Sequence, residues 1–150
     1  MKKLFVEKSV DIEAPAGRVW KILTDPNISR DWIRCWWPEF DVLESDWQPG
    51  SPVLWKLCNG TLGAEGIVVV SEPYWELTYN FRALEAPFEK EEVISFKLRE
   101  INEVTLLAIS VGNFGDSPEH EACYPGAVDA WNKSLPKIKS LSEAIKQLSN

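Results

Sequence analysis

The stretch that decides the fold is residues 4–37, LFVEKSVDIEAPAGRVWKILTDPNISRDWIRCWW. Its first residues alternate between apolar and polar side chains, which predicts a strand over Leu4–Glu13. Ala14-Pro15 breaks that strand, and apolar residues then recur at helical spacing until Asp25-Pro26, where the proline ends the helix. A second short helix is predicted over Ile28–Arg34, with Asn27 as its N-cap residue.

After this stretch the pattern predicts six more strands and a final helix. The expected strands are Phe40–Glu44, Pro52–Cys58, Leu62–Ser71, Trp75–Ala83, Glu92–Glu100 and Val104–Gly112. Short turns such as Asn59-Gly60 separate them, and short turns join antiparallel neighbours. A polar loop over 113–124 leads into a helix over Pro125–Leu148, which Pro136 should kink. The predicted class is α+β, with a curved antiparallel sheet around a long C-terminal helix.

The composition and charge of the chain argue against several classes of function. The 150 residues are 45% hydrophobic and 26% charged, which is typical of one globular domain spanning 1–150. A net charge of −7 argues against binding nucleic acid or an anionic membrane surface. No apolar run is long enough for a membrane span, and three scattered cysteines imply no disulfide framework. We expect a reduced, cytoplasmic protein without a cofactor.

Five segments carry a resemblance to a known family. They are VDIEAP at 10–15, VWKILTDP at 19–26, Trp32, Gly66-Ile67-Val68, and Trp131-x-x-x-Leu135. Together they resemble the START-like (SRPBCC, Bet v 1-like) superfamily, and within it the branch named for the activator of Hsp90 ATPase. The resemblance covers nearly the whole chain and implies a helix-grip fold, in which a ligand pocket often lies between sheet and C-terminal helix. It supplies no catalytic motif to carry over.

Aromatic side chains are the main candidates for lining such a pocket, because the chain has eight tryptophans. The rings whose positions could face the cavity are Trp36, Trp37, Trp55, Trp75, Tyr79, Phe81 and Trp131. The alternative is that most of these rings fill the core, as aromatic residues usually do. At least two or three of them are expected to touch the pocket.

Fewer polar residues than aromatic ones are candidates for contacting a ligand. Lys8 has inward parity on the first strand and would anchor a ligand carboxylate, unless its side chain reaches out to solvent. Cys123 joins the candidate binding residues. A nucleophilic pair of Cys123 or Cys35 with His120 stays open, although the acidic neighbours of His120 favour an exposed loop. One histidine rules out a multi-histidine zinc site, so no metal is expected. The acidic residues expected on a solvated edge are Glu85, Glu89, Glu91 and Glu92.

Three functions are consistent with these features. The first is a module that binds a hydrophobic or aromatic small molecule in a cavity above ~300 Å³. The second is an enzyme of the cyclase, dehydratase or hydrolase kind, with Lys8, Tyr79 and Glu92 as candidate titratable groups. The third, implied by the resemblance alone, is an interaction with the Hsp90 chaperone. The binding module ranks first, and the ligand and the oligomeric state, a homodimer included, stay open.

Overall fold

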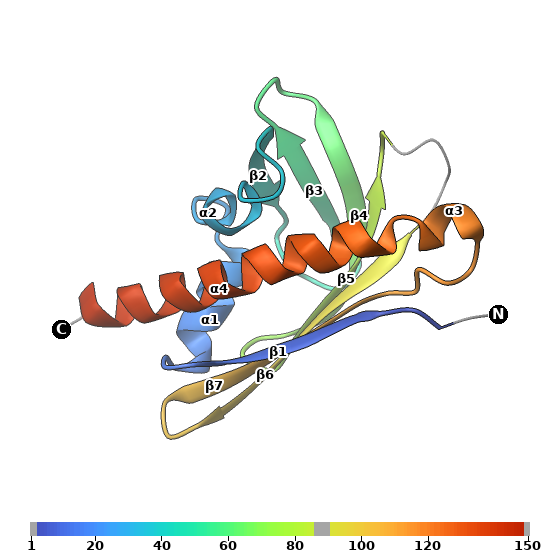
Figure 1. The fold of residues 1–150 in the computed structure, drawn as a ribbon. Coiled ribbons are helices and arrows are strands. Elements are labelled where there is room, and N and C mark those ends of the chain that lie inside the picture. The colour runs from blue at the N-terminus through green and yellow to red at the C-terminus, as the bar shows by residue number, and fades with distance from the viewer. Residues whose placement is uncertain (1–2, 86–90, 149–150) are drawn as a thin grey trace.

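A computed structural model describes residues 3–85 and 91–148 of the chain (Figure 1). Over these ranges the elements are β1 Val6–Ile12, α1 Ala16–Thr24, α2 Ser29–Ile33, β2 Phe40–Glu44, β3 Pro52–Leu57, β4 Leu62–Glu72, β5 Glu76–Ala83, β6 Glu92–Ile101, β7 Val104–Gly112, α3 Pro118–Glu121 and α4 Tyr124–Leu148. The predicted order of elements is confirmed. The short helix α3 lies inside the predicted polar loop.

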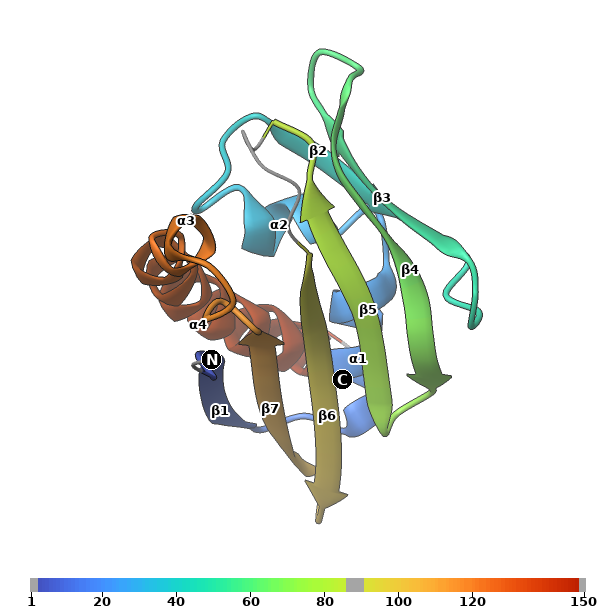
Figure 2. The same cartoon turned by 90° about the vertical axis from the view of Figure 1, so that its right-hand side faces the viewer.

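The strands form a single antiparallel sheet in the order β1-β7-β6-β5-β4-β3-β2. Neighbours in sequence are neighbours in the sheet from β2 to β7, while β1 crosses over to pair with β7, Val6 opposite Val111. The sheet is strongly curled, and α4 runs along its concave side with α1 and α2 beside it (Figures 1 and 2). This is the predicted α+β helix-grip architecture.

The core lies between the concave face of the sheet and α4. Along β6 the side chains of Ile94, Phe96 and Leu98 are buried, as period-two alternation predicts. From the helix, Trp131 and Ile138 are buried on the facing side. Burying each such side chain contributes roughly 1.5–3 kcal/mol, so the alternating strands and the apolar helix face stabilise each other.

One predicted orientation is wrong. Trp75 was expected to face the interior with the other aromatic residues of its strand, but its side chain is 68% exposed. Tyr74 has a φ of 75°, which turns the chain sharply, and β5 begins only at Glu76. The alternation of β5 therefore does not extend back to Trp75.

Two glycines let β4 bend around the interior. The pairing of β3 with β4 shifts register beside Gly63, where a Cβ would lie 2.7 Å from the Trp37 ring. At Gly66 a Cβ would overlap the Asn80 carbonyl of β5, so only glycine allows this close backbone approach.

Pro136 lies inside α4, and the helix continues through it.

None of the helices in the described ranges combines the length and the apolar character that a membrane crossing needs.

Candidate functional site

A cavity of about 160 Å³ lies between the sheet and the first turns of α4. Its lining consists of Trp36, Trp55, Phe81, Glu92, Ile94, Val111, Phe114, Gly126, Ala127, Ala130 and Trp131. These residues come from β3, β5, β6 and β7, from α4, and from the segments that follow α2 and β7. The expected hollow is present, but it is smaller than the ~300 Å³ predicted. Beside it, the Trp32 ring is fully buried in the core and the Trp37 ring packs against the core.

The aromatic wall is held in place by ring packing and by hydrogen bonds to the backbone. Trp55 contacts Phe81 edge to face, with ring centroids 5.0 Å apart, and Trp36 at 6.4 Å. Trp36 Nε1 donates to Ser134 Oγ at 2.8 Å, and that hydroxyl donates to the Trp32 carbonyl at 2.6 Å. The wall is therefore tied to α4 on one side and to α2 on the other.

Trp55 differs from Trp36 in the hydrogen bonding of its indole nitrogen. Trp55 is fully buried, and its Nε1 has no hydrogen-bond partner among the described residues. An unsatisfied buried donor costs about 1–3 kcal/mol, so this indole retains an unused capacity to donate to an acceptor placed beside it.

A chain of three ionisable side chains meets the cavity at Glu92. His120 lies with Nε2 2.9 Å from Glu92 Oε2 and Nδ1 2.9 Å from Asp116 Oδ1. The helix α3 fixes the ring, because Ser117 Oγ caps it by accepting from the His120 amide and Pro118 occupies its first turn. The Phe114 ring, which also lines the cavity, packs against the imidazole at 4.9 Å.

The protonation of this trio is constrained by its geometry. Both contacts are hydrogen bonds at once when an imidazolium donates from both nitrogens, or when one carboxyl is itself protonated. Burial raises the pKa of the Glu92 carboxyl, and the hydrogen bond from His120 offsets part of that rise. The ring lies between the carboxylates, so the three groups do not converge on one point as metal ligands would.

Two sequence expectations about these residues are wrong. His120 was expected in an exposed loop, but it is 1% exposed. Glu92 was expected on a solvated edge with its acidic neighbours, but its side chain is only 14% exposed. Glu85 and Glu91 are exposed as predicted, and Glu89 lies outside the described residues. Glu92 shares the inward parity of Ile94 and Phe96, and the sequence had also made it one of the three candidate titratable groups for an enzyme.

The predicted binding residues divide into two groups. Trp36, Trp55, Phe81 and Trp131 line the cavity together. The others lie outside its lining: Lys8, Trp37, Tyr79 and Cys123. Trp37 stacks behind Trp55 at 6.1 Å and supports the wall from outside.

Each of the remaining three has a different environment. Tyr79 is fully buried between Trp47 and Phe96, and burial raises the pKa of its phenol, which stays neutral. Cys123 is exposed at the junction of α3 and α4, where partial burial, and then the charge of Glu92, raise the pKa of its thiol. Lys8 lies half-buried on the edge strand β1, between two surface grooves.

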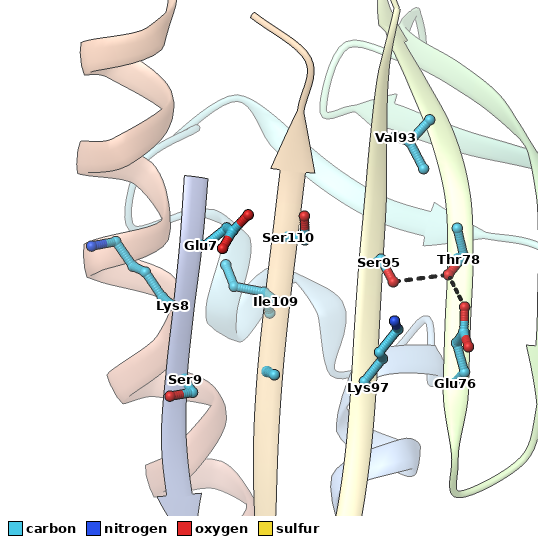
Figure 3. Close-up of a pocket in the computed structure, with 11 residues that line it drawn as sticks. Glu7, Lys8, Ser9, Glu76, Thr78, Val93, Ser95, Lys97, Ile109 and Ser110 are labelled. Carbon is cyan, nitrogen blue, oxygen red and sulfur yellow. Dashed lines mark hydrogen bonds between the residues drawn. The ribbon is translucent and has the colours of Figure 1, made fainter. Parts of the chain in front are cut away.

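A larger hollow of about 770 Å³ lies on the outer face of β1, β7, β6 and β5 (Figure 3). No helix crosses that face in Figure 2. Its lining mixes polar and apolar side chains, and Thr78 Oγ1 donates to Glu76 Oε2 at 2.9 Å and lies 3.0 Å from Ser95 Oγ, as the dashed lines show. Because it is open to solvent on the outer face of the sheet, it is a surface groove. The smaller inner cavity is the candidate site.

A curled antiparallel sheet that grips a long C-terminal helix, with a hollow between them, defines the START-like helix-grip class. Residues 13–143 match the family model described as "Activator of Hsp90 ATPase homolog 1-like protein". Since the match covers most of the chain, the chain belongs to this family. No curated protein matches the chain significantly.

Solved structures share the fold at low sequence identity. Protein MLL2253 from Mesorhizobium loti superposes with a TM-score of 0.77 at 21% identity, covering 93% of this chain and 97% of that one. DynU16, a putative protein in the dynemicin biosynthetic locus, gives 0.74 at 19%, covering 95% of this chain and 48% of that chain. The Aha1 dimer from Colwellia psychrerythraea gives 0.68 at 15%, covering 91% and 93%. These similarities establish the fold.

Proposed function

We propose that the chain is a small-molecule binding module that holds one ring-sized, largely apolar ligand between the sheet and α4. The observation that carries this proposal is the 160 Å³ hollow with an aromatic wall. An apolar cavity of ~150 Å³ is large enough to bind benzene, so a single substituted ring is the expected scale of ligand. Burial at roughly 25 cal/mol per Å² of apolar surface would drive binding.

Two further features support a ligand. Trp55, a residue of the lining, carries a buried Nε1 donor with no partner among the described residues. DynU16, a neighbour of the same fold, is described as a protein of a biosynthetic locus, which is a setting for small-molecule handling.

Binding is tested by titrating benzyl alcohol, a neutral single-ring probe, while following tryptophan fluorescence. Trp36, Trp55 and Trp131 line the cavity, so a bound ring is expected to change their emission and to give a saturable curve. Native mass spectrometry of freshly purified protein tests separately for a ligand carried from the cell. No saturable binding up to the solubility of the probe, together with no co-purifying molecule, would contradict the proposal.

A matched pair of variants locates the binding. Ala130→Leu adds a side chain to the lining of the cavity, and is expected to weaken binding of the probe about tenfold or more while α4 stays folded. Ala144→Leu makes the same change at an exposed position further along α4 and should leave binding unchanged. Equal affinities in the two variants would place the bound probe elsewhere.

The Glu92–His120 contact favours a second function, proton transfer in an enzyme of the cyclase, dehydratase or hydrolase kind. A carboxyl with a raised pKa at a cavity is suited to general acid–base chemistry. A co-purifying molecule that the wild-type protein converts and Glu92→Gln does not would support it. The expected role with the Hsp90 chaperone stays a prediction, since it rests on the family resemblance.

A further inference from the structure

Among the residues that the structure describes, the lining of the cavity carries one ionisable side chain. Five of its eleven residues are aromatic, the others except Glu92 are aliphatic residues or glycine, and Glu92 supplies a carboxylate at one end. The faces of aromatic rings carry partial negative charge, which attracts cations. The aromatic wall and the carboxylate therefore both favour a positively charged ligand.

The surroundings of Glu92 leave this negative charge only partly compensated. Within the described ranges its carboxylate contacts one basic group, the His120 imidazole, whose ring also contacts Asp116. Among the described residues no lysine or arginine contacts Glu92, and Asp116 and Glu91 add further negative potential there.

We propose that the cavity selects an organic cation, a protonated amine carried on a single ring, whose ammonium group contacts the Glu92 carboxylate. The hydrocarbon part would pack against Trp36, Trp55 and Trp131, which is the chemistry by which aromatic cages hold alkylammonium groups. This inference rests on the proposed function and deepens it by naming the ligand class. Its size limit is set by the 160 Å³ of the cavity.

The amino end of α4 opposes this preference. Gly126 and Ala127, in the first turn of the helix, line the cavity, and a helix amino end carries about half a positive charge. The backbone amides of this region are partly engaged, since the Ala127 amide donates to the Cys123 carbonyl at 3.1 Å. The full charge of the Glu92 carboxylate outweighs the helix term, so an anion is disfavoured.

The test compares three probes of nearly equal size at neutral pH: benzylamine, which is protonated, benzyl alcohol, which is neutral, and benzoate, which is an anion. Calorimetric titration of the wild-type protein should show benzylamine binding about tenfold tighter than benzyl alcohol, as a charge-assisted hydrogen bond supplies. Benzoate should be the weakest of the three. Equal affinities for the amine and the alcohol would overturn the inference and leave the proposed function standing.

Substitution of Glu92 tests whether its carboxylate is responsible for the preference for the amine. Glu92→Gln keeps the size of the side chain and can still hydrogen-bond His120, so it should lower benzylamine affinity to the level of benzyl alcohol without changing the alcohol. Glu91→Gln removes the same charge from the exposed neighbouring residue and should keep most of the preference for the amine. An unchanged preference in Glu92→Gln would overturn the inference. If none of the probes binds wild type, the inference falls together with the proposed function.

If Glu92→Gln does not fold, the wild-type ratios decide the matter by themselves. Circular dichroism of each variant establishes folding before titration.

Discussion

Glu92 is the residue at which the stability of the chain and its proposed activity oppose each other. Its carboxylate lies at the edge of an apolar cavity with a side chain only 14% exposed, and its hydrogen bond to His120 does not fully compensate the loss of hydration. Residues that serve binding are often retained at some cost to folding. A charged ligand would supply the missing interaction.

This cost predicts a dependence of stability on pH. Because the pKa of Glu92 is raised, the folded chain holds this proton more tightly than the unfolded chain does. Its contribution to stability is fully present below the ordinary value of 4.5 and is lost as the pH rises through the raised value. Glu92→Gln removes this titration, so the variant should gain in free energy of unfolding relative to wild type as the pH rises from 4 to neutrality.

Urea denaturation at a series of pH values measures the difference between the two proteins. His120, Asp116 and Glu91, which face or adjoin Glu92, are present in both proteins. Glu91→Gln, which removes the same charge at an exposed position, is the control and should show a smaller change with pH than Glu92→Gln. A difference for Glu92→Gln that is constant across the series would contradict the assigned pKa direction.

Part of this site could be predicted from the sequence. Glu92 follows the inward parity of Ile94 and Phe96, so its orientation could be predicted from alternation alone. The position of His120 could not, because it depends on a short capped helix that folds back over the end of β6, a tertiary contact across 28 positions. Local patterns do not encode such contacts.

At the scale of elements, β4 depends on a glycine that no other residue can replace. A Cβ at Gly66 would overlap the Asn80 carbonyl, and a backbone atom cannot move aside as a flexible side chain can. Gly66→Ala is therefore expected to destabilise the chain by more than about 3 kcal/mol, at the upper end for overpacking. Thermal or urea unfolding measures the change.

Gly126→Ala is the matched control for this prediction. It has ordinary helical backbone at the start of α4, and a Cβ there would meet no atom within 4 Å. The substitution should be neutral or stabilise by about 0.5 kcal/mol, because alanine favours the helix. Similar effects of the two substitutions would mean that β4 and β5 do not approach as closely as described.

The elements themselves could be predicted well where hydrophobic periodicity was strong. β2 and β7 begin and end at the predicted residues, and α4 begins within one residue of its prediction. The errors occur where the chain turns. The positive φ of Tyr74 redirects Trp75, and such a backbone conformation at a tyrosine has no sequence signature.

For the whole molecule, ligand binding and unfolding are linked. A ligand that binds only the folded chain at ~100 times its Kd adds about 2.7 kcal/mol to the free energy of unfolding. For a chain of this size that corresponds to a rise in Tm of roughly 5–10 °C. Differential scanning fluorimetry with saturating benzylamine should show this rise for wild type and Ala144→Leu. A rise of the same size in Ala130→Leu would mean that the ligand does not occupy the cavity.

The size of the hollow is the whole-molecule property that could not be predicted. The fold class implies a space between sheet and helix, but its volume is what remains after Trp32, Trp37 and the other rings have packed. That remainder depends on rotamers and on side-chain contacts between distant elements. Among the aromatic residues for which the sequence left core and pocket as alternatives, some fill the core and others line the cavity.

His120 is the only histidine in the chain, and it lies against Glu92. Its ring protons resonate in a region of the proton NMR spectrum where an imidazole is easily recognised, so here one set of signals belongs to one known site without any assignment. A ligand that reaches the Glu92 carboxylate would alter the magnetic environment of that ring. The chain thus contains its own spectroscopic probe at the point where recognition is proposed to occur.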